Sequence, residues 1–122
     1  MFFTDFYKVN HTDTSSSGTI FHIELNPGHD IYKAHFPGQP VLPGACTLQI
    51  IKECAQQMLN KKLQYSRINL CKFLRYVDPV QCNEIKLTIS FNENEDGSLQ
   101  MISNGTCEDS FFIKTKAIMK VK

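Results

Sequence analysis

One histidine of this chain stands in a segment that the sequence makes unusually rigid. Residues 33–44 read KAHFPGQPVLPG and place His35 among three prolines and two glycines. Prolines restrict the unfolded chain, so such a loop holds its side chains in fixed positions. Because histidine titrates near neutral pH, His35 is a candidate general acid or base. The alternative is a turn in which the imidazole only hydrogen-bonds to the backbone.

A helix that begins directly after this segment supplies a second chemical feature. Pro43 and Gly44 give a sharp start to an apolar run, nine residues after His35. The first N–H groups of a helix have no carbonyl partner and lie at the positive end of the helix dipole. They favour negative charge, such as that on a thioester or carboxylate oxygen. Because every helix has such an end, this one is a candidate part of a site only because it lies close to His35 in the sequence.

Two polar residues follow on one side of the expected helix. Gln49 lies in about the second turn and Glu53 lies one turn later, about 5–6 Å along the axis. The Gln49 amide can hydrogen-bond a hydroxyl group or a water, but it cannot supply a proton as a carboxylic acid does. The alternative for both residues is a solvated polar stripe without a function, because charged helix positions are usually exposed.

The remaining histidines have weaker claims to a chemical role. His29, beside Asp30, either orients His35 or belongs to a surface turn. His22 falls in an expected strand and His11 lies near the amino terminus. Neither has a companion that would make it a ligand or a base, so we expect no metal site.

The residues with candidate roles need a sheet and a long helix to position them. Apolar residues recur at three- and four-residue spacing over 45–60, which predicts one helix of about four turns. The loop before it, through Gly44, is expected to be irregular. Strands are predicted at 19–25, 68–76, 84–92, 99–107 and 111–121, separated by turn-forming residues. This order indicates a single α+β domain over residues 1–122, with the helix across one face of an antiparallel sheet.

Composition excludes several classes of partner. The chain has 122 residues, 42% of them hydrophobic, and a formal net charge of +1. Its basic residues are scattered, so we expect no nucleic-acid partner. No apolar run approaches the length of a membrane span and no signal peptide is evident, which predicts a cytoplasmic protein.

The cysteines indicate a reducing compartment. Five are present, an odd number, and none forms a C-x-x-C pair or a zinc-like spacing with histidine. We expect most of them to be small buried apolar residues rather than a disulfide scaffold. They are Cys46, Cys54, Cys71, Cys82 and Cys107.

The run HFPGQPVLPG followed by a helix resembles the active-site motif of the β-hydroxyacyl-ACP dehydratases, which have the hotdog fold. The match is close over residues 34–44, and the order of elements and the run RYVDPVQCNEIKL resemble the family more loosely. The resemblance implies an antiparallel sheet wrapped around one long central helix, with active sites formed between two subunits. It also implies a dehydratase that acts on 3-hydroxyacyl chains carried by the phosphopantetheine arm of acyl carrier protein. Such chemistry requires no metal or redox cofactor.

The resemblance assigns roles to three residues. His35 matches the catalytic histidine, and Gly44 matches the position whose N–H contacts the thioester carbonyl. The family's acidic residue, which comes from the partner's helix, falls on Gln49, so this chain is a divergent member without the usual acid. This departure leaves three functions open: a 3-hydroxyacyl-ACP dehydratase in which His35 makes both proton transfers or borrows Glu53, an enzyme for conjugated substrates that eliminate water more easily, or a non-catalytic acyl-binding subunit. The protein would work as a homodimer or as a heterodimer with a paralogue. A hotdog thioesterase is a further enzymatic alternative.

Overall fold

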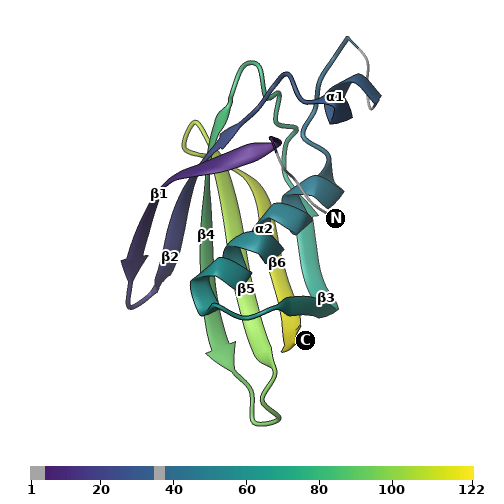
Figure 1. Cartoon of the computed structure of the whole chain (residues 1–122). Coiled ribbons are helices and arrows are strands. Elements are labelled where there is room, and N and C mark those ends of the chain that lie inside the picture. Colours follow the sequence, from purple (N-terminus) through teal and green to yellow (C-terminus); the bar gives the residue numbers. More distant parts are fainter. Residues whose placement is uncertain (1–4, 35–37) are drawn as a thin grey trace.

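The fold is an antiparallel sheet with a helix of 16 residues across one face (Figure 1). The computed structural model describes residues 5–34 and 38–122, and in these ranges six strands form the order β1-β2-β4-β5-β6-β3. The strands are β1 (Tyr7–Ser15), β2 (Gly18–Leu25), β3 (Leu63–Phe73), β4 (Glu84–Glu93), β5 (Leu99–Cys107) and β6 (Ser110–Val121), and the helices are α1 (Asp30–Ala34) and α2 (Gly44–Leu59).

Alternating burial shows how the sheet makes its core. In β2, Phe21, Ile23 and Leu25 are buried while the residues between them are at least partly exposed. The buried face of β4 follows the same period of two, as expected for a sheet with one covered side. From α2, Ile50 and Ile51 join the same core cluster. Helix α2 therefore packs its apolar side chains on the buried face of the sheet.

Helix α2 ends at Leu59, because the next residue has a left-handed backbone conformation. Asn60 has φ 52° and ψ 44°, and its N–H donates to the carbonyl of Gln56. Asparagine tolerates this conformation better than most residues and is a common helix terminator. The observed bounds lie within one residue of the predicted 45–60. No helix in the described part of the chain is long and apolar enough to cross a lipid bilayer.

Two elements were not predicted, and a third has different bounds. Strand β1 was missed because it is an edge strand with only two partly buried positions, so its sequence carries little apolar alternation. The segment expected to be wholly irregular contains the short helix α1. Strand β3 begins at Leu63, five residues before the predicted start, and ends at Phe73. Two register shifts interrupt its pairing with β6, which disturbs the alternation that the prediction used.

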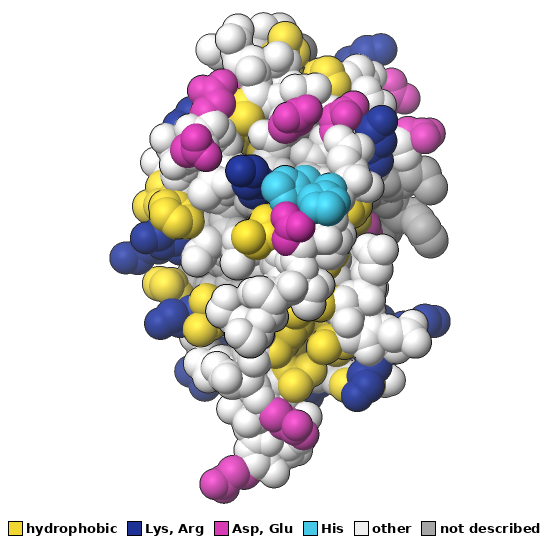
Figure 2. Space-filling model, turned by 90° about the vertical axis from the view of Figure 1, so that its left-hand side faces the viewer, with side chains coloured by type: hydrophobic (Ala, Val, Ile, Leu, Met, Phe, Trp, Pro, Cys, Tyr) yellow, Lys and Arg dark blue, Asp and Glu magenta, His cyan; other side chains and the backbone are white. Residues whose placement is uncertain are grey.

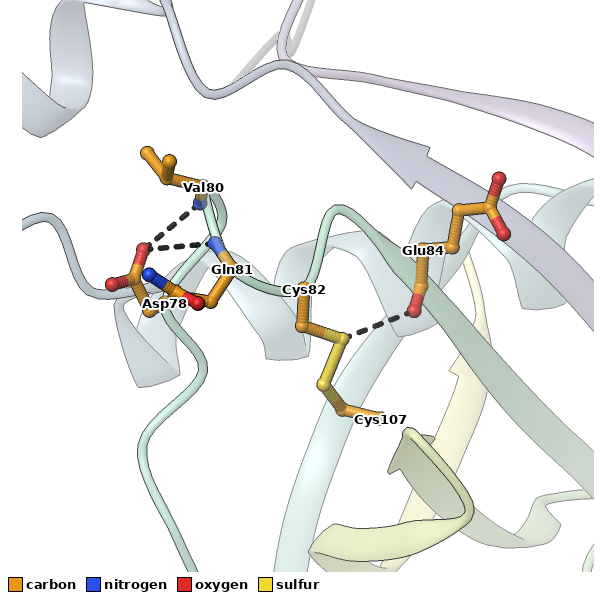
Figure 3. The surroundings of a disulfide bond; sticks show 6 residues. All are labelled: Asp78, Val80, Gln81, Cys82, Glu84 and Cys107. Atoms are coloured by element: carbon orange, nitrogen blue, oxygen red, sulfur yellow. Dashed lines mark hydrogen bonds between the residues drawn. A yellow bond between two sulfur atoms is a disulfide. The ribbon is translucent and has the colours of Figure 1, made fainter.

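A disulfide bond joins the loop before β4 to the end of β5. Cys82 and Cys107 are bonded, although the sequence led us to expect buried thiols, so that expectation is wrong for this pair. Figure 3 shows the surroundings, where the Asp78 carboxylate accepts hydrogen bonds from the N–H groups of Val80 and Gln81. The turn that begins at Asp78 is thus stabilised by its side chain and carries Cys82 toward Cys107. The two cysteines are 25 residues apart, and such a pairing cannot be deduced from spacing.

The remaining cysteines should differ in their reaction with alkylating reagents. Cys54 is buried and burial raises its pKa to about 12, whereas Cys71 is partly exposed. Because the thiolate is the reactive form, iodoacetamide should label Cys71 at least about 10-fold faster than Cys54 in the native protein. Peptide mass spectrometry without reductant measures both rates and should recover Cys82 linked to Cys107. Equal labelling of Cys54 and Cys71 would contradict the assigned burial, and a Cys71→Ser variant identifies the fast site.

Candidate active site

The amino-terminal end of α2 opens onto an apolar hollow. Pro43 precedes the helix with an extended backbone, and its side chain forms no capping hydrogen bond. The hollow has a volume of about 540 Å³. It is lined by Val41, Leu42, Pro43, Gly44, Thr47, Phe73, Leu74, Arg75, Tyr76, Val77 and Phe112. Unpaired helix N–H groups beside an apolar wall can hold a polar oxygen at the end of a hydrocarbon chain.

The ring of Phe73 lies directly against Gly44. A Cβ placed on Gly44 would stand 2.6 Å from the Cζ of Phe73, closer than carbon atoms can approach. Gly44 has no positive φ, so its backbone would suit any residue, and the nearest described atoms that an added side chain would meet belong to the Phe73 ring. Phe73 is 52% exposed and ends the edge strand β3. Gly44 therefore gives the aromatic ring close access to the helix start.

Gln49 and Glu53 form a hydrogen-bonded chain with a tyrosine from the edge of the sheet. The Gln49 side-chain amide donates to Oε2 of Glu53 over 2.9 Å, and the Tyr7 hydroxyl donates to Oε1 over 2.7 Å. Burial, and then the hydrogen bond to Glu53, raise the pKa of Tyr7 far above its ordinary value, so Tyr7 is a neutral donor. The predicted proximity of Gln49 and Glu53 is confirmed. Tyr7 was missed because β1 was missed.

Gly44 and Gln49 lie on different sides of α2. Residues of an α-helix are separated by about 100°, so five positions place Gln49 about 140° around the axis from Gly44. Thr47, three residues after Gly44, does line the hollow, whereas Gln49 does not. The described part of one chain thus brings Gly44 to the hollow and leaves Gln49 facing elsewhere.

The predicted catalytic histidine, His35, lies outside the described residues. Helix α1 ends at Ala34, and Gly38 resumes the description with φ 81°. His29 lies in the turn before α1, where its Nδ1 accepts a hydrogen bond from the N–H of Ile31 over 3.1 Å. Its ring also packs edge-on against Phe6. His29 therefore lies in a turn, as one of its two interpretations expected, and the other, a contact with His35, lies outside the described residues.

His11 and His22 contradict the expectation that neither has a companion. Both rings contact the carboxylate of Asp13, His11 at 2.7 Å and His22 at 2.9 Å. Their partner was not recognised because strand β1 was not predicted, and the pairing of β1 with β2 brings the three residues together. This cluster is on the far face of the sheet from α2, since His22 alternates with the core residues Phe21 and Ile23.

Comparison with known proteins shows the family of this chain. The family model of ApeI-like proteins, described as ApeI dehydratase, matches residues 10–110. The chain belongs to the ApeI-like dehydratase family. The match runs from Asn10, within β1, to Ser110, the first residue of β6, and includes α2. The predicted membership of a hotdog dehydratase family is thereby confirmed.

Solved structures share the fold of this ApeI-like chain. The dehydratase heterocomplex ApeI:P from Xenorhabdus doucetiae matches with a TM-score of 0.72 and 22% identity, over 92% of this chain and 96% of that chain. An uncharacterised protein from Erwinia carotovora subsp. atroseptica matches with a TM-score of 0.58 and 19% identity, over 95% of this chain and 91% of that chain. A search of curated proteins found no match.

Proposed function

We propose that this ApeI-like protein is a 3-hydroxyacyl-[acyl-carrier-protein] dehydratase, eliminating water from 3-hydroxyacyl thioesters in fatty-acid or related polyene synthesis. The observation that carries the proposal is the start of α2, where Gly44 opens onto an apolar hollow in a member of a dehydratase family. The thioester carbonyl would accept a hydrogen bond from the Gly44 N–H. The apolar hollow beside it suits the hydrocarbon part of an acyl chain.

The proposed reaction divides its tasks among three residues, and His35 makes both proton transfers. His35 removes the proton from the α-carbon, and the helix start stabilises the negative charge that develops on the carbonyl oxygen. The β-hydroxyl then leaves with a proton as water, and a double bond forms between the α- and β-carbons. Gln49 positions the hydroxyl, and the proton returns from His35. The reaction requires no metal or redox cofactor, and the phosphopantetheine arm comes with the carrier protein.

A second hotdog subunit would complete this site. Gln49 faces away from the hollow of its own chain, so the proposal needs the partner's Gln49, with each sheet curled around its long helix. Strand β3 ends the sheet, and large apolar side chains on and just after it are exposed. They are Ile68, Phe73, Leu74 and Tyr76. A strand edge and an apolar strip of this kind favour burial against another subunit.

A non-catalytic acyl-binding subunit is the second candidate function. It is favoured by Gln49, which cannot donate a proton as a carboxylic acid does, and by the structural likeness to a protein of a dehydratase heterocomplex. In that case a paralogue would supply the acid. Glu53 is an unsuitable substitute, because its two carboxylate oxygens already accept hydrogen bonds from Tyr7 and Gln49.

Turnover of a chain-length series of 3-hydroxyacyl-ACP substrates tests the proposal. We expect the purified protein to form the enoyl product, and Gln49→Glu to raise the rate by about 10- to 100-fold, within the range of a positioned general acid. Glu53→Gln is the matched control on the same helix and should change the rate little. Release of free thiol would identify a thioesterase instead. Enoyl product from Gln49→Glu but none from wild type, at any chain length, would favour the non-catalytic subunit.

A further inference from the structure

A cluster of two histidines and an aspartate lies on the outer face of the sheet, away from the candidate active site. His11 and Asp13 come from β1 and His22 from β2. Figure 2 shows the histidines side by side on this face, with an acidic side chain against them. The three ligand-type atoms all lie within 4.8 Å of one another. The proposed dehydratase reaction uses none of these residues.

A β-bulge creates the cluster. Val9 is paired with Ile23, but the register then shifts by one residue, so His11 rather than Asn10 is paired with His22. Without the shift, His11 would be opposite Phe21 and would point toward the core. With it, His11 and Asp13 share the outer face with His22, because directly paired residues point to the same side of a sheet. Bulges commonly re-aim side chains in this way.

The geometry of the cluster suits a transition-metal ion. The Nε2 atoms of His11 and His22 lie 2.7 and 2.9 Å from the two oxygens of Asp13, and the ring centroids are 5.2 Å apart. A tetrahedral Zn²⁺ with bonds of about 2.0–2.1 Å places its ligand atoms about 3.3 Å apart. Only small movements of the three side chains would admit the ion. We propose that His11, Asp13 and His22 bind Zn²⁺ through both Nε2 atoms and one carboxylate oxygen.

The surroundings give the ion room and a favourable local charge. Next to the histidines is a hollow of about 530 Å³, which leaves space for water on a fourth coordination position. Glu84, Glu108 and Asp109 line this hollow and offset Lys86, the strand partner of His22. Cys82 also lines it, but its sulfur is held in the disulfide and is not available as a thiolate.

Metal binding would stabilise an exposed edge of the sheet. Strand β1 pairs only with β2 in the described part of the chain, and its residues after Val9 are exposed. Two ligands on β1 and one on β2 would cross-link the hairpin at the bulge, where the regular pairing is interrupted.

Titration calorimetry with ZnCl₂ tests the site directly. We expect one Zn²⁺ per chain, and at least about 10-fold weaker binding in His11→Gln, His22→Gln and Asp13→Asn. His29→Gln removes a histidine outside the cluster and should bind Zn²⁺ as wild type does. All four substitutions are at partly or fully exposed positions, and circular dichroism without metal checks that each variant keeps its fold.

Spectroscopy identifies the coordinating atoms. Long-range ¹H–¹⁵N spectra should show Zn²⁺-dependent shifts at Nε2 of His11 and His22. Co²⁺, used as a probe, should give visible absorption without sulfur-to-cobalt charge transfer. Equal Zn²⁺ affinity in the wild type and the His11→Gln/His22→Gln double variant would overturn the proposal, as would a thiolate charge-transfer band. Neither result would affect the dehydratase assay, because the two sites lie on opposite faces of the sheet.

Discussion

Replacing His35 by Ala should lower kcat/KM for 3-hydroxyacyl-ACP by about 10²- to 10⁴-fold, which is the usual contribution of one positioned acid–base group. The proposed reaction gives His35 both proton transfers, because Gln49 has no proton to donate as an acid. In an enzyme with a second proton donor, loss of the histidine would leave more of the chemistry intact. The loss should therefore lie at the upper end of this range, and enoyl formation at saturating and limiting substrate measures it.

A matched histidine variant separates this effect from general damage. His11→Gln removes an exposed imidazole from the outer face of the sheet and should keep the wild-type rate in buffer without added metal. The pH dependence adds a second check, since an essential base gives a rate that falls as the histidine is protonated. Full activity in His35→Ala would exclude His35 as the base and would remove the main support for the proposed mechanism.

Sequence reasoning succeeded where one physical signal dominated. The start of α2 at Gly44 follows from Pro43, and its length follows from the helical spacing of apolar residues such as Ile51. Strand β5 was predicted with its observed bounds because turn-forming residues stand on both sides of it. Local sequence alone sets these features, so a single chain is enough to find them.

Features set by pairing between distant segments could not be found in this way. The bulge at Asn10 leaves no mark in composition, yet it decides whether His11 faces the core or joins His22. Phe73 was included in a predicted strand, but its packing on Gly44 depends on how that strand crosses the end of α2. In each case the sequence supplies the residue type, and the fold supplies the neighbour.

The contact between Gly44 and Phe73 makes the helix start unusually sensitive to substitution. Gly44→Val adds a branched side chain whose Cβ would stand 2.6 Å from the ring of Phe73. Because Phe73 is 52% exposed, the ring can swing away and the protein should remain folded. The new side chain and the displaced ring would then occupy the hollow where the thioester is proposed to bind. Displacing a substrate by about 1 Å can cost about 10²-fold, so we expect a loss in kcat/KM of that order.

A control variant and a double substitution test whether the clash with the Phe73 ring causes the loss of activity in Gly44→Val. Ala45→Val places a valine one residue later, at an exposed position, and should leave the rate nearly unchanged. Phe73→Ala combined with Gly44→Val relieves the clash and should recover at least about 10-fold of the lost rate, a coupling expected only for residues in contact. If the double variant is as slow as Gly44→Val, the valine itself blocks the site and the ring is not responsible. If Gly44→Val is fully active, the thioester does not bind at the start of α2, and the candidate active site must lie elsewhere on the chain.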